Sequence, residues 1–189
     1  CMAHLPPTRL GVNVYPLPDF SQDIVEETDK YVVKKNEWGA VGRWIKEGVQ
    51  SIPQFLSFGV QNRDDFLACR DRLDPLDLKR YPSNWAQLKQ GWKDRDCPVT
   101  LWTLGWYAVL REMMGVEDLS TNFYDQPKLL EEICEYWTDF NIKVFERALN
   151  EVEVDYVLFW EDLAFKTSSL VSPSHFKHFF VKHYRRLLD

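Results

Sequence analysis

The second half of the chain has apolar residues that recur three and four positions apart, the period of a helix with one buried face. The longest such stretch covers residues 127–150, with Asp125 as a candidate cap, and residues 104–114 have the same period. Ser172 followed by Pro173 predicts the start of a last helix. The stripe of the long helix is formed by Leu130, Ile133, Trp137, Phe140, Val144 and Ala148.

Shorter elements surround these helices. Residues 97–102 and 154–160 are apolar and β-branched runs that predict strands, and the second is apolar at nearly every position. A strand that is buried on both faces is typical of a parallel sheet covered by helices. Asn62 and Ser83 are candidate caps of two short helices. The order strand, helices, strand, helix predicts an α/β fold.

The first 60 residues are rich in β-branched and aromatic side chains with turn residues between them. Residues 31–33 and 40–45 are extended runs on either side of a turn at residues 36–39. They predict a β-hairpin that ends at Gly48. Because the hairpin is too polar for a central position, we expect it to be an excursion on the surface or over a site.

Composition narrows the class of protein. Of 189 residues, 45% are apolar and 15% aromatic, enough for the core of one domain or two. The formal net charge of −6, without a basic block, argues against nucleic-acid and anionic-membrane partners. The N-terminal stretch lacks a charged start followed by an apolar core, so we do not expect it to be a secretory signal, and no apolar run approaches the roughly 20 residues that cross a bilayer.

The cysteines and the chain ends add two expectations. The spacing of the cysteines suits no compact zinc site, so we expect reduced thiols in a cytoplasmic protein. The chain begins at a cysteine and ends at Asp189 without a stop signal, so we expect a fragment that is cut at both ends. The four cysteines are Cys1, Cys69, Cys97 and Cys134.

Two adjacent acids are the main candidates for chemistry. Glu161 and Asp162 directly follow the strand that ends at Trp160. Ligands of α/β folds bind at the carboxyl ends of strands, and partial burial would raise a carboxyl pKa toward that of a general acid. The alternative is that one acid caps the following turn while the other pairs with Lys166. We assign catalysis to both acids and substrate contact to Trp160.

The segment after the other strand should reach the same edge and share one cavity with these acids. Tyr107 offers a phenol that could donate a hydrogen bond to a developing anion. The alternative is that Tyr107 is an ordinary core residue. Arg111 lies one helical turn further and could clamp a substrate carboxylate, unless it pairs with Glu112 or Asp118. We assign catalysis to Tyr107 and substrate contact to Trp102 and Arg111.

Three histidines near the end of the chain look like a metal cluster but lack the spacing of one. His175 and His178 lie three apart, and no carboxylate or thiol completes a set with His183. We expect all three on the solvent face and flank of the last helix, and we predict no metal site within this chain.

At these residues, the chain from about Leu10 to its end resembles the uroporphyrinogen decarboxylase superfamily, which includes the methylcobalamin:coenzyme M methyltransferases. The motifs that carry the resemblance are Trp102-Thr103-Leu104, Leu110-Arg111-Glu112-Met113-Met114-Gly115, Trp160-Glu161-Asp162-Leu163-Ala164 and Ser172-Pro173-Ser174-His175-Phe176. The family fold implies a partial (β/α)8 barrel over residues 1–189, with an N-terminal β-hairpin excursion in residues 1–60 and barrel βα units in 97–189. Tyr107 matches a substrate-contacting tyrosine, and Asp162 falls where the decarboxylase has a serine.

The resemblance implies an enzyme that removes carboxyl groups from a tetrapyrrole or related substrate without a cofactor. The alternative is a corrinoid-dependent methyltransferase that uses zinc, with the ligands outside this chain. A third reading is a non-catalytic ligand-binding barrel. The expected partners are a small-molecule substrate, a second copy in a homodimer and, for the methyltransferase, a corrinoid protein. We expect the fragment alone to be inactive.

Overall fold

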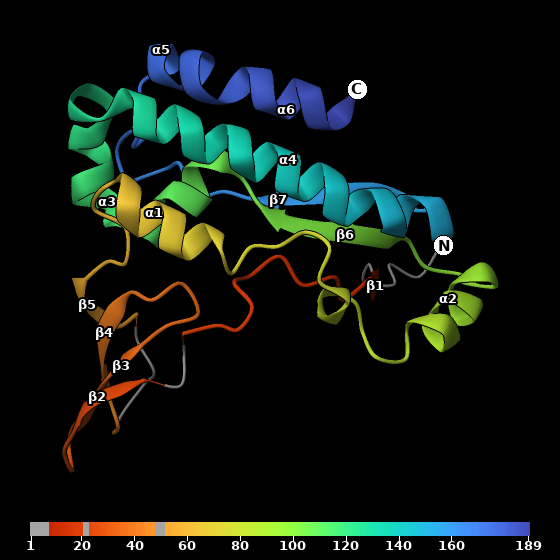
Figure 1. The fold of residues 1–189 in the computed structure, drawn as a ribbon, viewed down its shortest axis with the longest axis horizontal. Helices are drawn as coiled ribbons and strands as arrows, with labels where there is room; N and C mark the ends of the chain where they lie inside the picture. The colour runs from red at the N-terminus through yellow and green to blue at the C-terminus, as the bar shows by residue number, and fades with distance from the viewer. Residues whose placement is uncertain (1–7, 21–22, 48–51) are drawn as a thin grey trace.

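A computed structural model describes residues 8–20, 23–47 and 52–189 (Figure 1). The strands of this part of the chain form two separate sheets. The strands are β1 (Thr8–Arg9), β2 (Ile24–Glu27), β3 (Tyr31–Lys35), β4 (Val41–Ile45), β5 (Gln54–Ser57), β6 (Val99–Leu104) and β7 (Tyr156–Trp160). The helices are α1 (Arg63–Arg70), α2 (Trp85–Lys93), α3 (Trp106–Asp125), α4 (Pro127–Glu151), α5 (Pro173–His175) and α6 (Val181–Leu188), with helical turns η1 (Leu78–Arg80) and η2 (Phe176–Phe180).

The first sheet is parallel, with β6 between β1 and β7. The helices α3 and α4 connect β6 to β7, and α6 lies on the outer side of α4 (Figure 1). Two buried hydrogen bonds fix α4 on β6. The hydroxyl of Thr103 bonds to the side-chain oxygen of Asn141 at 2.7 Å, and the indole of Trp137 donates to the carbonyl of Leu104 at 3.0 Å. The predicted helices therefore cover the sheet through polar as well as apolar contacts.

The strand β7 is covered less completely than its sequence predicts. Phe159 packs against Trp106 and Tyr184, with ring centroids 5.8 and 5.3 Å apart. Tyr156 and Trp160, at the two ends of the strand, are 40% and 38% exposed. The prediction that this strand is buried on both faces was wrong, because the helices cover the face of Phe159 while the other face is covered only in part.

The second sheet is antiparallel, in the order β2-β3-β4-β5, and projects away from the helices (Figure 1). Its central pair, β3 and β4, is the hairpin that the sequence predicts, with Val33 opposite Arg43. In the turn, the side-chain oxygen of Asn36 accepts from the backbone nitrogens of Trp38 and Ala40 at 3.0 and 2.9 Å. Gly48, the predicted end of the hairpin, lies outside the described residues, as does Cys1.

The expectation of a partial (β/α)8 barrel is contradicted. The described residues have a mixed α/β fold with a three-stranded parallel sheet and a separate four-stranded antiparallel sheet. A barrel repeats a strand followed by a helix around a closed sheet. Here β1 is followed by the antiparallel sheet and two short helices, not by one βα unit, before the chain returns to the parallel sheet at β6.

Several helix ends differ from those expected. Asn62 caps α1 as predicted, and Ser172 accepts from the backbone nitrogen of His175 at 3.2 Å at the start of α5. The second short helix begins after Asn84, not at Ser83, and Asp125 ends α3 instead of capping α4. Among the helices of the described residues, none is both long and apolar enough to cross a membrane.

The helix α3 continues past the predicted end at residue 114 through a kink at Gly115. This glycine has a φ of 77°, a conformation that residues with a side chain rarely adopt. A Cβ atom at this position would lie 2.3 Å from the ring of Phe58. Both the positive φ and the closeness of Phe58 therefore require glycine at this position of α3.

Candidate functional site

The carboxyl ends of β6 and β7 lie side by side. Leu104 is in register with Trp160, and the backbone nitrogen of Gly105 donates to the Trp160 carbonyl at 2.9 Å. The structure thus brings the segment 102–107 and the acids that follow β7 to one edge of the parallel sheet, as the sequence predicts. Ligand sites of open α/β sheets are found at this edge.

Glu161 caps the helix α3. Its carboxylate accepts from the backbone nitrogens of Tyr107 and Ala108 at 3.3 and 2.9 Å, and from the hydroxyl of Tyr184. The N-cap residue, Gly105, has no side chain that could do this, and a negative charge is favourable at a helix N-terminus. Burial raises the pKa of Glu161, while the three hydrogen bonds oppose that rise. Both oxygens are occupied, so the group acts as a cap, although of the earlier helix α3 and not of the turn that follows it.

Arg111 lies between two carboxylates. It donates to Asp162 through Nη1 and to Glu112 through Nη2, the latter at 3.1 Å. Its guanidinium also lies 5.1 Å from the centroid of the Trp160 ring. The structure therefore brings together three of the predicted site residues, Arg111, Trp160 and Asp162. Because Arg111 is already paired twice, a substrate carboxylate would have to compete with Glu112 and Asp162 for it.

Tyr107 is a core residue by its packing, with an exposed fraction of 1%. Its hydroxyl has no hydrogen-bond partner among the described residues. Burial raises the pKa of this phenol, and the positive charge of Arg111 opposes the rise. The phenol is therefore protonated at neutral pH, and its assignment to catalysis stays a prediction.

A pocket of about 170 Å³ opens at this edge, and we call it the edge pocket. Tyr15 stacks on Trp102 with ring centroids 6.0 Å apart, and the ring centroid of Trp38 lies 5.9 Å from that of Tyr15. Its walls are aromatic and acidic, and they come from both sheets and α3. The lining residues are Tyr15, Glu37, Trp38, Trp102, Leu104, Glu112 and Trp160.

Glu112 is an acidic group of the edge pocket whose pKa is raised by its surroundings. Burial raises the pKa of its carboxyl group, and the charges of Glu37 and Asp162 raise it further. Its ion pair with Arg111 opposes the rise. A carboxyl group with a raised pKa beside an aromatic pocket has the property that a general acid requires.

A second pocket, of about 340 Å³, adjoins the edge pocket and shares Tyr15 and Trp102 with it. We call it the Arg9 pocket. The guanidinium of Arg9 lies 5.4 Å from the centroid of the Trp102 ring. Within the part of the chain that the structure describes, Arg9 has no carboxylate partner, in contrast to Arg111. It is therefore the better placed of the two cations to meet a substrate carboxylate.

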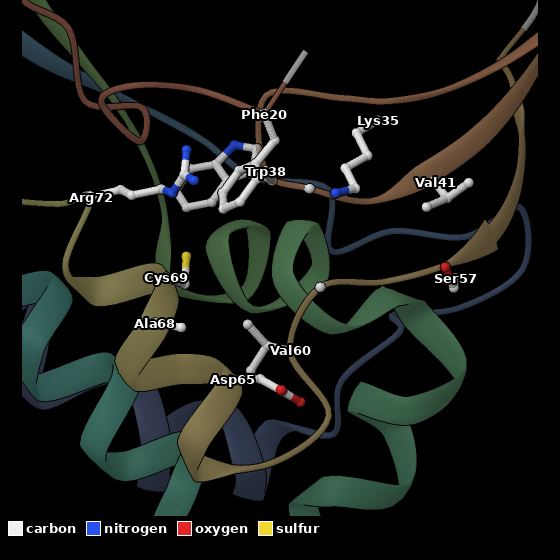
Figure 2. A pocket seen from close by; sticks show the side chains of 12 residues that line it. Phe20, Lys35, Trp38, Val41, Ser57, Val60, Asp65, Ala68, Cys69 and Arg72 are labelled. Carbon is white, nitrogen blue, oxygen red and sulfur yellow. The ribbon is translucent and has the colours of Figure 1, made fainter. Parts of the chain in front are cut away.

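A larger pocket, of about 410 Å³, shares Trp38 with the edge pocket and lies between the antiparallel sheet and α1 (Figure 2). Its cations are engaged, because Lys35 pairs with Asp23 at 2.8 Å and Arg72 donates to the Pro18 carbonyl at 2.8 Å. Burial raises the pKa of Cys69, which also lines it, to about 11. A protonated thiol is a poor nucleophile, so this pocket offers less chemistry than the edge pocket.

Sequence reasoning missed several residues of the site. Glu112 was considered only as a partner of Arg111, because its position three residues before the kink at Gly115 gave no sign of a pocket. The turn at residues 36–39 was predicted, and the structure places two of its side chains at the pocket. No local signal marked Arg9 or Tyr15. The missed residues are Arg9, Tyr15, Glu37, Trp38 and Glu112.

The histidines form no metal site within the described residues. No group of three His, Cys, Asp or Glu side chains in residues 8–20, 23–47 and 52–189 is placed to hold an ion. His183 was expected on the surface but is 1% exposed, because it stacks on Trp106 and bonds through Nδ1 to the hydroxyl of Thr138 at 2.8 Å. No described cluster therefore fits the zinc of the methyltransferase alternative.

Comparison of the chain with protein-family models, with curated proteins and with solved structures finds no match. What the geometry defines is an α/β protein with an acidic, aromatic pocket at the carboxyl edge of its parallel sheet.

Proposed function

We propose that this protein is a decarboxylase similar to those of the uroporphyrinogen decarboxylase superfamily and that it acts in the edge pocket. One observation carries the proposal. The carboxyl group of Glu112, whose pKa is raised by burial, lies at a small aromatic pocket beside the motif residues of the resemblance. A group of this kind supplies the proton that decarboxylation of an electron-rich ring requires.

The chemistry needs no cofactor. Glu112 transfers its proton to a ring carbon of a substrate that carries an acetate side chain, which makes the ring cationic. The bond to the carboxylate carbon then breaks, CO₂ leaves, and the bonding electrons neutralise the ring. The exocyclic carbon takes a proton from solvent, and the ring carbon returns its proton to Glu112. The sum is one carboxylate and one proton converted to a methyl group and CO₂.

Arg9 and Arg111 have different roles in this proposal. Arg9 binds the substrate carboxylate from the adjoining pocket, because it has no carboxylate partner among the described residues. Arg111 is a positioning residue. Its guanidinium donates hydrogen bonds to Glu112, at 3.1 Å, and to Asp162. Substrate contact by Trp102 and Trp160 is part of the proposal, since both line the edge pocket.

A cytoplasmic location belongs to the same proposal, and three free thiols, Cys69, Cys97 and Cys134, support it. The substrate is a tetrapyrrole or a smaller ring with acetate side chains. The adjoining pockets of about 170 and 340 Å³ would hold one ring and its carboxylate, with the remainder of a larger substrate outside.

The test is decarboxylation of uroporphyrinogen by the purified protein, measured as CO₂ release and as the number of carboxyl groups left on the product. Turnover by this chain would at the same time overturn the expectation that it is inactive alone. Glu112→Gln should lower kcat by about 10²–10⁴-fold, the range of general-acid catalysis. Arg9→Gln should mainly raise KM, because it removes a binding contact. Glu153→Gln, at an exposed position, is the control and should keep full activity.

Unchanged kcat in Glu112→Gln would contradict the assignment of the acid. Methyl transfer from methylcobalamin to a thiol, without CO₂ release, would support the corrinoid-dependent alternative. Binding of the porphyrinogen with neither reaction would favour the ligand-binding alternative.

A further inference from the structure

The charges at the edge pocket are unbalanced. Its seven lining residues include two carboxylates, Glu37 and Glu112, and no cationic side chain. Arg111 pairs with Glu112 but also with Asp162, so its single positive charge is shared between two acids. Glu37 is exposed on the turn between β3 and β4, and within the described residues its carboxylate forms neither a hydrogen bond nor an ion pair. A negative potential therefore remains at the pocket.

The aromatic walls also favour a positively charged ligand. Four of the lining residues are aromatic, and the face of an aromatic ring attracts a positive charge. Two of these rings already bind guanidinium groups, since Arg9 lies 5.4 Å from the centroid of Trp102 and Arg111 lies 5.1 Å from that of Trp160. Rings and carboxylates around one small cavity are the arrangement that recognises organic ammonium groups.

The size and chemistry of the pocket limit the cation further. About 170 Å³ is less than the roughly 300–1,000 Å³ of pockets that hold drug-sized ligands, so the occupant is a small cation or one cationic group of a larger molecule. Mg²⁺ and Ca²⁺ take six or more oxygen ligands, whereas most of this wall is ring carbon.

We infer that the edge pocket binds an organic cation, held between the carboxylates of Glu37 and Glu112 and the rings of Tyr15, Trp102 and Trp160. The substrate is thus a compound that carries, or acquires during the reaction, a positively charged nitrogen-containing group at this point. The inference rests on the proposed function, because transfer of the Glu112 proton to the ring would create such a cation there and leave Glu112 as the carboxylate that faces it. A stable cation nevertheless tests it without any turnover.

The experiment compares two probes of the same shape. Choline carries a quaternary ammonium group, and 3,3-dimethylbutan-1-ol is its neutral analogue with carbon in place of nitrogen. Titration calorimetry with the purified protein should show choline binding at least about tenfold more tightly, since a charge–ring contact with a nearby carboxylate exceeds the contribution of shape alone. A higher salt concentration should weaken the binding of choline but not the binding of the alcohol.

Variants locate the site. Glu37→Gln and Glu112→Gln should each raise the Kd for choline by about fivefold or more, and Trp160→Leu should do the same because it removes a ring face. Glu153→Gln, an exposed glutamate elsewhere on the chain, is the matched control and should bind choline like the parent protein. Circular dichroism and the unfolding midpoint of each variant verify that it is folded, and Glu37 is exposed, so its variant is the safest of the three.

The outcomes separate this inference from the proposed function. If the parent protein prefers choline to its neutral analogue, Glu37→Gln loses this preference and no decarboxylation is seen, the cation site is supported and the decarboxylase is overturned. Decarboxylation without any preference for choline over its neutral analogue overturns the cation site and leaves the decarboxylase. Choline preference that survives in both glutamate variants also overturns the inference, because binding then occurs elsewhere.

Discussion

The carboxylate of Glu161 occupies the space that a side chain at Gly105 would need. A Cβ atom on residue 105 would lie 2.0 Å from Oε1 of Glu161, much closer than any real contact. The glycine thus allows an acid from the end of β7 to cap α3, which begins at the end of β6. This single relationship fixes the two segments of the candidate site relative to each other.

Gly105→Ala should therefore destabilise the protein by about 2–4 kcal/mol, from steric overlap and from loss of the cap. Urea unfolding of the purified protein measures this. In the double variant with Glu161→Ala the overlap disappears, so the two effects should be clearly less than additive. Full additivity would show that the cap and the glycine are not coupled.

Replacement of Arg80 should disturb the edge pocket without touching it. Arg80 is 1% exposed and donates to the carbonyls of Asn13, Tyr15, Arg72 and Asp74 at 2.6–3.1 Å. Lysine cannot make these four bonds, so Arg80→Lys should lower the free energy of unfolding by about 2–4 kcal/mol, since buried carbonyls lose their donors.

Because Arg80 holds the backbone of Tyr15, which lines the pocket, the same variant should also weaken choline binding. Arg63→Lys is the control, since Arg63 forms an exposed ion pair with Glu132 and should contribute less than about 1 kcal/mol. Equal stability of the two variants would show that Arg80 does not hold this segment.

The hydroxyl of Tyr107 should contribute nothing to stability. It is buried and has no hydrogen-bond partner among the described residues, so Tyr107→Phe removes a polar group that burial disfavours. We expect the free energy of unfolding to be unchanged or to rise by up to about 1 kcal/mol. If kcat for decarboxylation falls in this variant while stability does not, the hydroxyl acts on the substrate. A stability loss above that range would reveal a bond that this geometry lacks.

The stability of the protein should fall in mild acid because of His183. Burial lowers the pKa of His183 from its ordinary value of 6.5 to about 4 in the folded protein. Between these values, the unfolded chain binds a proton that the folded protein does not, so acid favours unfolding. The free energy of unfolding starts to fall as the pH drops below about 6.5, and the loss reaches at most about 3 kcal/mol near pH 4. Above pH 6.5, His183 makes no contribution to the pH dependence of stability.

Urea unfolding at several pH values between 7.5 and 4.5 tests this expectation against His183→Gln, which cannot titrate. The difference in stability between the two proteins should change with pH in favour of the variant as the solution becomes more acidic. Parallel curves would mean that His183 has the same pKa in the folded and unfolded states.

The hydrophobic pattern predicts the long helix α4 and two of the three described parallel strands, β6 and β7, because each depends on local repetition along the chain. Asn62 and Ser172 cap helices where expected, and β7 lies within its predicted run, whereas β6 extends past the predicted end at residue 102 to Leu104. Such local patterns did not predict how far the parallel sheet extends on either side of β6 and β7. The barrel expected from the resemblance is contradicted, because the residues between β1 and β6 form a separate antiparallel sheet and short helices.

For the site, the sequence by itself determined that the segment after β6 and the acids after β7 meet at one sheet edge, since parallel neighbouring strands end on the same side. Only the tertiary structure decided which of these groups are engaged and which face a cavity. Glu161 is bound by backbone amides from α3, while Glu37 and Glu112 come together from distant segments at an aromatic pocket. Pairing of charges across such distances follows from packing, and no local spacing in the chain encodes it.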